Sequence, residues 1–246
     1  MTLNELCGTL AACRRCADAG YFIGSTPIAT LNAGATFMTV GQAPGRHEAE
    51  VTGLPFSGPA GKRLFRWLAG AGFDEAEFRA TQAMTAITLC YPGPHPAGRG
   101  DRVPTRAEQA LCAPWLAAAL ALINPKVLIP IGGLAIGRFL QSPTVTGFAV
   151  SGSTAQPAIQ QAASEASRRG SFAGDAPQLA LSSQPAQDDT IRSLRMTDLI
   201  GQRFERDGRI IVPLPHPSGA SQWFNAPANK VRLERALGIL AELRVA

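Results

Sequence analysis

Four short, mostly apolar segments stand out along the chain, at residues 36–40, 84–89, 126–131 and 209–214. They are rich in β-branched and other large apolar residues, and they lack the strict polar–apolar alternation of a strand with one wet face. Segments of this kind are typical of strands that a parallel sheet buries on both faces. The pattern therefore predicts four such strands.

Helical patterns separate these predicted strands. Residues 62–71 and 106–124 carry apolar side chains three and four positions apart, and residues 229–245 form a terminal amphipathic segment. Strands that alternate with helices predict βαβ units in a layered α/β domain. Ligands of such domains bind at the carboxyl ends of the strands, so we expect the functional loops at that edge of the sheet.

Composition and charge narrow the class of protein. The chain has 246 residues, and its 23 Lys and Arg outnumber 18 Asp and Glu, giving a formal net charge of +5. Hydrophobic residues make up 46% and charged residues 17%, which excludes a wholly disordered chain. No apolar stretch approaches the ~18 residues of a membrane span, and no signal peptide is visible, so we expect a cytoplasmic protein with no membrane partner. The net charge favours an anionic partner such as nucleic acid, without deciding it.

One long stretch differs from the rest of the chain. Residues 141–193 are rich in Ser, Ala, Gln and Gly and contain few large apolar side chains. We interpret this stretch as an insertion, flexible or locally helical, because it lacks the apolar content of a second core. The sequence therefore predicts a single domain over residues 1–246 that carries this insertion.

Four of the five cysteines form a candidate metal site. Cys13 and Cys16 are separated by two residues, a spacing that lets two thiolates reach one metal centre. Cys90 follows the second predicted strand, and Cys112 lies within the next predicted helix. Zinc and an iron–sulfur cluster fit this spacing equally well, and the last two cysteines are also compatible with ordinary buried thiols.

Three loops carry further candidate chemistry. The Gly-Gln-Ala-Pro-Gly loop at 41–45 follows a predicted strand, and its backbone N–H groups suit an oxygen or phosphate ligand. Phe56 lies in a glycine-rich loop, either as a stacking platform for a planar ring or as a local apolar plug. His216 closes the fourth predicted strand, where it serves as a hydrogen-bond donor, an acid or base, or a solvated loop residue.

These features occur in a fixed order. The order and spacing of the motifs resemble the uracil-DNA glycosylase superfamily, most closely its family 4 iron–sulfur members, over nearly the whole chain outside 141–193. The resemblance implies a three-layer α/β/α sandwich with a central four-stranded parallel sheet. It also implies a structural four-iron four-sulfur cluster in place of zinc. The motifs are CRRC at 13–16, GQAPG at 41–45, GLPFSGPAG at 53–61, Cys90, Cys112, PKVLIPIG at 125–132 and HPS at 216–218.

The resemblance also implies an activity and a site. It implies a monofunctional DNA repair glycosylase that hydrolyses the N-glycosidic bond of uracil in DNA, and we expect it to act as a monomer. His216 is then the donor to the departing base, and Gln42 or Glu48, with Glu50 as an alternative to Glu48, serves the attacking water. The implied cluster ligands are Cys13, Cys16, Cys90 and Cys112. The implied base-binding residues are Gly41, Ala43, Phe56 and Ala86, and the implied DNA-binding residues are Pro217, Ser218, Gly219 and Ser221.

Several positions depart from the family 4 pattern. Ala86 replaces an Asn that reads the base edge, and Gln42 replaces an acidic residue. Gly45 stands where stricter members carry a bulky aromatic, so we expect a roomier pocket. Asp101 occupies the slot of the histidine through which some relatives trap uracil covalently, so we expect no covalent trapping. The loss of the Asn amide predicts that hypoxanthine and xanthine are also excised.

Other interpretations stay open. The same departures suit an inactive member of the fold that only binds damaged or single-stranded DNA. A structural or adaptor protein with four zinc-bound cysteines is a further alternative. Trp223 and Phe224 follow the HPS motif, as wedges into a base stack or as anchors in the core.

Overall fold

The computed structural model describes residues 1–98, 100–141, 195–218 and 222–245. The strands are β1 (Phe37–Gly41), β2 (Ala83–Ala86), β3 (Val127–Pro130), β4 (Phe204–Arg206) and β5 (Arg209–Ile211). The α-helices are α1 (Leu3–Ala11), α2 (Arg15–Asp18), α3 (Pro59–Gly70), α4 (Glu75–Thr81), α5 (Arg106–Ile123), α6 (Gly133–Ile136), α9 (Met196–Leu199) and α10 (Pro227–Val245). Single π-helical turns also occur at Glu48–Thr52 and Gly137–Gln141, and a 3₁₀ turn at Gln222–Asn225.

The sheet has the strand order β2-β1-β3-β5-β4. The first four strands in this order are parallel, which confirms the predicted α/β class and parallel sheet. The predicted number of four strands is wrong, because β4 adds an antiparallel fifth strand beside β5. Asp207 and Gly208 both have positive φ angles, of 52° and 72°, and two such residues form the tight turn that folds one strand back onto the next.

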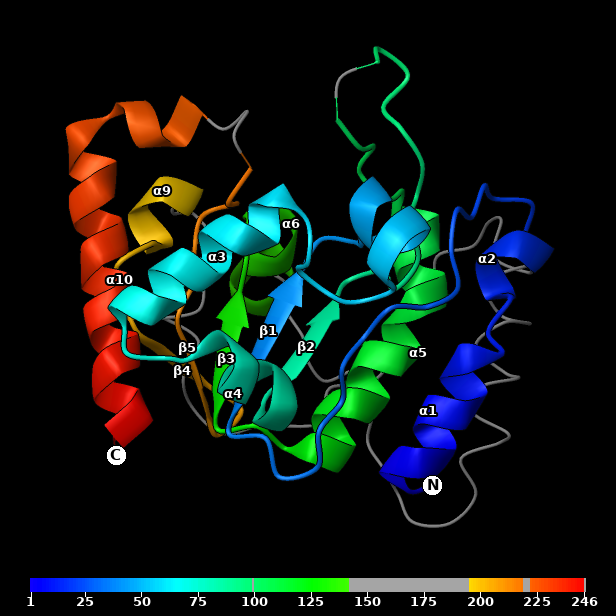
Figure 1. Cartoon of the computed structure of the whole chain (residues 1–246), viewed down its shortest axis with the longest axis horizontal. Helices are drawn as coiled ribbons and strands as arrows, with labels where there is room; N and C mark the ends of the chain where they lie inside the picture. Colours follow the sequence, from blue (N-terminus) through cyan, green and yellow to red (C-terminus); the bar gives the residue numbers. More distant parts are fainter. Residues whose placement is uncertain (99, 142–194, 219–221, 246) are drawn as a thin grey trace, which may run out of the picture.

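Helices cover both faces of the sheet, as in a three-layer sandwich (Figure 1). One apolar cluster includes Met38 of β1 and buried residues of α1 and α5. The other includes Ile129 of β3 and buried residues of α3, α4 and α10. Successive residues of the inner strands contribute to opposite clusters, because side chains alternate across a strand. This explains why the strands lack a polar face in the sequence.

The start of α5 is fixed by a buried ion pair. The Thr105 side chain caps the helix, and Glu108 accepts hydrogen bonds from the Thr105 backbone N–H and hydroxyl, both at 2.8 Å. The Arg102 guanidinium donates to both Glu108 oxygens, at 2.7 and 2.6 Å. These hydrogen bonds, led by those from Arg102, lower the pKa of Glu108 to about 2 although the side chain is buried. The loop before α5 is therefore tied firmly to the helix.

Both outer strands of the sheet have protected edges. Thr30 pairs with Met84 of β2 through two backbone hydrogen bonds of 2.8 Å. At the opposite edge, β4 is only three residues long, and its Glu205 is exposed and paired with Arg203. The sheet therefore offers no long apolar edge within the described residues.

Two predictions concern the chain as a whole. None of the helices in residues 1–141 and 195–245 is both long enough and apolar enough to cross a membrane. The insertion predicted at 141–193 lies, beyond its first residue, outside the described residues. A single domain over residues 1–246 therefore stays a prediction.

Candidate functional site

A cavity of about 680 Å³ opens at the carboxyl edge of the sheet. The loops that follow β1, β2, β3 and β5 all contribute to its wall, as expected for a ligand site in a parallel sheet. Its volume lies in the range of small-molecule sites. Gly219 and Ser221, two of the predicted DNA-binding residues, lie outside the described residues. The other predicted base, catalytic and DNA positions all line the cavity: Gly41, Gln42, Ala43, Glu48, Phe56, Ala86, His216, Pro217 and Ser218.

Phe56 lies over the end of β1. A Cβ atom placed on Gly41 would stand 3.0 Å from the Phe56 Cζ atom, so the glycine leaves room for the ring. The Phe56 backbone has a φ angle of 51°, which is uncommon for a residue other than glycine, Asn or Asp. A backbone in this region needs support from its surroundings, and two neighbours supply it.

The supports of the Phe56 turn are Arg79 and Gly61. Arg79 of α4 donates to the carbonyl oxygens of Pro55 and Phe56, both at 2.8 Å, and lies 4.3 Å from the centre of the Phe65 ring. A Cβ atom on Gly61 of α3 would stand 1.7 Å from the Phe56 carbonyl oxygen. Sequence reasoning missed both roles. The only available signal was the glycine at the end of the GLPFSGPAG motif.

His216 presents a neutral imidazole to the cavity. The Ser218 backbone N–H donates to the His216 Nδ1 atom at 3.2 Å, which places the ring proton on Nε2. The ring is exposed through the mouth of the cavity, yet the protein atoms packed around it lower its pKa by desolvation. A Cβ atom on Gly132, whose φ is 81°, would stand 3.1 Å from the ring. The absence of a side chain at Gly132 therefore leaves room for the His216 ring. The arrangement leaves an Nε2–H donor.

Gln42 and Glu48 differ in how their side chains are engaged. The Gln42 backbone carbonyl accepts from Thr88, and in the described part of the chain its carboxamide has no hydrogen-bond partner. The Glu48 side chain is only 8% exposed. Its two carboxylate oxygens accept backbone N–H groups, from Gly45 at 3.1 Å and from Gly58 at 3.0 Å. Glu48 therefore joins the loop after β1 to the start of α3.

The positions that depart from the family 4 pattern line the same cavity. Gly41 and Ala86 are partners in the register of β1 and β2, so Ala86 presents a methyl group beside the Gln42 loop. The space beside Gly45 is not open as expected. A Cβ atom there would stand 2.8 Å from Glu48 Oε2 and 3.1 Å from Asp101 Oδ2. Two carboxylates therefore occupy the room that the missing side chain leaves.

The loop after His216 is held by α3. Arg63 donates to the Ser218 carbonyl oxygen at 3.2 Å and lies 5.8 Å from the centre of the Phe224 ring. Phe224 also packs against Trp67, with ring centres 5.4 Å apart. Phe224 therefore anchors the start of the C-terminal segment to α3, whatever it contributes to a DNA contact.

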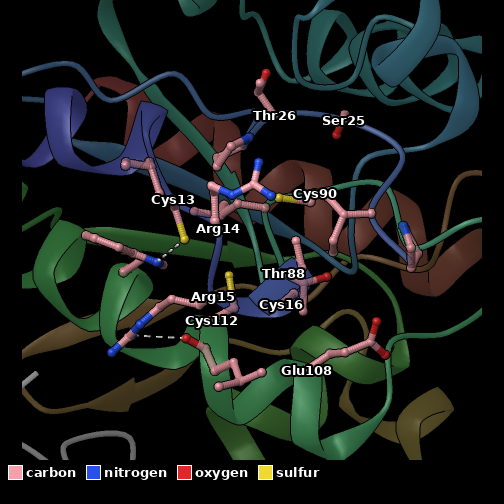
Figure 2. A pocket seen from close by; sticks show the side chains of 18 of the residues that line it. Cys13, Arg14, Arg15, Cys16, Ser25, Thr26, Thr88, Cys90, Glu108 and Cys112 are labelled. Carbon is pink, nitrogen blue, oxygen red and sulfur yellow. Dashed lines mark hydrogen bonds between the residues drawn. The ribbon is translucent and has the colours of Figure 1, made fainter. Parts of the chain in front are cut away.

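A second cavity, of about 780 Å³, is lined by the four predicted metal ligands (Figure 2). Cys13 and Cys16 come from the N-terminal segment, Cys90 from the loop after β2 and Cys112 from α5. The Trp115 indole N–H donates to the Cys13 sulfur at 3.2 Å. Cys7 is exposed on α1 and does not line this cavity.

The thiols of this cysteine pocket share one environment. Burial, and then the neighbouring Cys13 and Cys16, raise the pKa of Cys90 to about 12. Burial likewise raises the pKa of Cys112 to about 12. Among the described residues, no group of three or more His, Cys, Asp or Glu side chains is spaced to hold one metal ion. The four cysteines line one pocket without forming such a group.

Comparison with known proteins identifies the family. The model of the uracil DNA glycosylase superfamily matches residues 28–238. The chain belongs to the uracil DNA glycosylase superfamily. A type-4 uracil-DNA glycosylase of Thermotoga maritima is 33% identical over 107 residues, which cover 44% of this chain and 50% of that protein. One of Archaeoglobus fulgidus is 30% identical over 138 residues, covering 54% of this chain and 61% of that protein. The chain thus spans about half the length of the relatives that it matches.

The superfamily match covers the strands and loops around the cavity at the carboxyl edge of the sheet. It includes β1, β2, β3 and β5, whose loops carry Gln42, Phe56 and His216. It begins after Cys13 and Cys16, so these two N-terminal cysteines lie outside the matched region. Although they lie outside the matched region, both cysteines line the cysteine pocket together with Cys90 and Cys112.

Proposed function

We propose that this chain is a monofunctional DNA repair glycosylase that hydrolyses the N-glycosidic bond of uracil in DNA. The observation that carries the proposal is the meeting of Gln42 and Phe56, from the connection between β1 and α3, with His216, from the loop after β5, in one cavity. Two relatives named as type-4 uracil-DNA glycosylases support the same conclusion. The alternative, a member that binds damaged DNA without turnover, predicts the same cavity and differs only in activity.

Substrate binding requires an extruded nucleotide, because the glycosidic bond of a stacked base is out of reach. Phe56 is the stacking surface for the extruded base, on the side of the ring that faces away from Gly41. The backbone of the Gln42–Ala43 turn approaches a carbonyl oxygen of the base. Pro217 and Ser218, at the mouth of the cavity, contact the DNA backbone next to the extruded nucleotide.

Bond cleavage leaves negative charge on the departing base and cationic character on the sugar. His216 meets the first requirement, since a neutral imidazole with its proton on Nε2 donates to an oxygen that gains charge. Such a donor acts mainly in the transition state, where the charge is largest. The protein atoms packed around the ring support the neutral form, because they desolvate the imidazole and lower its pKa.

The attacking water needs a group that orients it. We assign this role to Gln42, because this residue lines the cavity and its carboxamide makes no hydrogen bond to another described residue. Glu48, the other candidate, has both oxygens bonded to backbone N–H groups. Its part in the proposal is to hold the loop that carries Gln42.

The alanine at position 86 favours excision of a broader range of bases. A methyl group makes no hydrogen bond to the base edge, so discrimination between uracil and other deaminated bases is weak at this position. We extend the proposal to hypoxanthine and xanthine. The test is a set of oligonucleotides with one uracil, hypoxanthine or xanthine, assayed for alkali-labile abasic product with wild type and Ala86→Asn. We expect product from all three with wild type, and a higher ratio of uracil to hypoxanthine excision with Ala86→Asn.

The results of this test separate the alternatives. Wild type that binds the uracil oligonucleotide without forming product overturns the glycosylase and favours the DNA-binding alternative. Product from uracil alone overturns the broad range and leaves the glycosylase in place.

The cysteine pocket suits a structural four-iron four-sulfur cluster. Four cysteine thiolates are the usual ligand set of such a cluster, and four cysteines line this one pocket. Cys13, Cys16, Cys90 and Cys112 would hold it. When bound, the cluster supplies structural cross-linking between the N-terminal segment and α5.

Replacement of one ligand tests the cluster. Cys90→Ser is expected to lose the charge-transfer absorbance of thiolate-bound iron near about 400 nm and most of the bound iron. Cys7→Ser is the matched control, because Cys7 is exposed outside the pocket, and it is expected to keep both. A colourless wild type that binds zinc would contradict the cluster and favour a zinc site.

A further inference from the structure

Two carboxylates approach the loop that carries Gln42. Glu48 Oε2 and Asp101 Oδ2 lie 2.8 and 3.1 Å from the position that a Cβ atom on Gly45 would take. Both residues line the base cavity. They come from different segments, since Glu48 starts the π-helical turn after β1 and Asp101 lies in the loop between β2 and α5. The two carboxylates differ in their hydrogen bonds and in their exposure.

Glu48 is committed to the backbone. Each of its oxygens accepts one N–H group, and the side chain is only 8% exposed. A water molecule at Glu48 would share the carboxylate oxygens with these two backbone N–H groups. Glu48 therefore serves as a brace between two loops.

Asp101 is open to the cavity. The residue is exposed, and no Lys, Arg or His of the described chain forms an ion pair with it. Its side chain lies beside Tyr91, whose pKa is raised by burial, then by the Asp101 charge and by a hydrogen bond with Asp101. Arg46 also interacts electrostatically with Asp101, without forming an ion pair with it. The adjacent Arg102 does not neutralise it, because both arms of that guanidinium are bonded to Glu108.

The backbone of Asp101 is held in place on both sides. Asp101 pairs with Pro94 in an antiparallel bridge, and the Arg102 N–H donates to the Gly93 carbonyl oxygen at 3.0 Å. The Arg102–Glu108 ion pair ties the same point to α5. Glu108 is among the labelled residues of the cysteine pocket (Figure 2). The Arg102–Glu108 ion pair therefore connects the Asp101 segment to the wall of that pocket. A carboxylate on a fixed backbone is suited to a reaction that needs a defined geometry.

We propose that Asp101 is the catalytic base of the glycosylase, an inference that rests on the proposed function. Its carboxylate takes a proton from the water that Gln42 orients, as the water oxygen bonds to the anomeric carbon of the sugar. The bond from that carbon to the base nitrogen breaks, and its electron pair leaves with the base, where the His216 N–H stabilises the charge. The proton then passes from Asp101 to solvent, so the carboxylate is restored.

The experiment compares variants in single turnover, with enzyme in excess over a single-stranded oligonucleotide that contains one uracil. Asp101→Asn is expected to lower the excision rate by roughly 100- to 1,000-fold, the usual contribution of a general base. Affinity for the same oligonucleotide with 2′-fluoro-2′-deoxyuridine, which resists cleavage, is expected to be unchanged. Added sodium formate is expected to raise the rate of Asp101→Ala by roughly tenfold or more, because formate supplies the missing carboxylate.

Glu48→Gln is the comparison variant from the same cavity. Its amide N–H₂ group faces a backbone N–H, so its melting temperature is expected to fall, and formate is expected to leave its rate unchanged. An active wild type with Asp101→Asn at the same rate, or Asp101→Ala without response to formate, overturns the inference alone. Wild type without turnover overturns both the inference and the proposed function.

Discussion

Replacement of His216 by alanine is expected to lower the single-turnover rate of uracil excision by roughly 100- to 1,000-fold. The reason is that the Nε2–H donor meets charge that develops only as the glycosidic bond breaks. The loss corresponds to about 2.7 to 4 kcal/mol of transition-state stabilisation, as for other preorganised oxyanion donors. The measurement is the rate of abasic-site formation with enzyme in excess.

A conservative variant and a pH profile accompany this prediction. His216→Gln keeps an N–H donor and is expected to retain more activity than His216→Ala. Burial lowers the pKa of His216, so protonation of the ring sets in only below the ordinary histidine value of about 6.5. Protonation would also put a hydrogen on His216 Nδ1, which now accepts the Ser218 N–H, and would break that hydrogen bond. The His216-dependent part of the rate is therefore expected to stay level as the pH falls through that value. Equal rates for His216→Ala and wild type would refute the donor role.

Gly61→Ala is expected to damage both stability and base binding. Its Cβ atom would stand 1.7 Å from the Phe56 carbonyl oxygen, which is backbone and has little room to move. A cost of about 3 kcal/mol, at the upper end for an overfilled site, corresponds to a fall in melting temperature of roughly 6 to 12 °C. Displacement of the Phe56 turn also removes the stacking surface, so the affinity for uracil-containing DNA is expected to fall.

The same helix provides the control. Gly70 also lies on α3, and no atom stands within 4 Å of a Cβ placed there. Gly70→Ala is expected to leave the melting temperature unchanged or to raise it slightly, because alanine is favoured over glycine in a helix by about 1 kcal/mol. If Gly61→Ala and Gly70→Ala both have the melting temperature of the wild type, α3 does not approach the Phe56 turn this closely in solution.

The fold could be predicted from the sequence wherever burial leaves a clear pattern. The apolar segments gave the four parallel strands, and the spacing of apolar residues gave α3, α5 and α10 within a few residues. The missing strand, β4, is short and half polar, so its own residues carry little signal. The Asp207-Gly208 pair does carry one, because this dipeptide favours the turn of a hairpin, and it was overlooked.

The site was predictable in its residue types and less so in its contacts. Gln42, Phe56 and His216 carry recognisable motifs, and the order of parallel strands brings their loops to one edge. The bonds of Glu48 to backbone N–H groups, the clamp by Arg79 and the open carboxylate of Asp101 arise only when separate segments meet. Most of these contacts have no local signal, because Glu48 with Gly58 and Arg79 with Pro55 and Phe56 are ten or more residues apart in the sequence.

The protected edges of the sheet bear on how the protein behaves at high concentration. Unpaired strand edges are templates for pairing between molecules, which leads to aggregation. Here Thr30 occupies the β2 side, and the charged, three-residue β4 closes the other. Within the described residues, growth of the sheet from one copy into the next is therefore hindered at both edges, so the loop-lined face can stay exposed without favouring polymerisation.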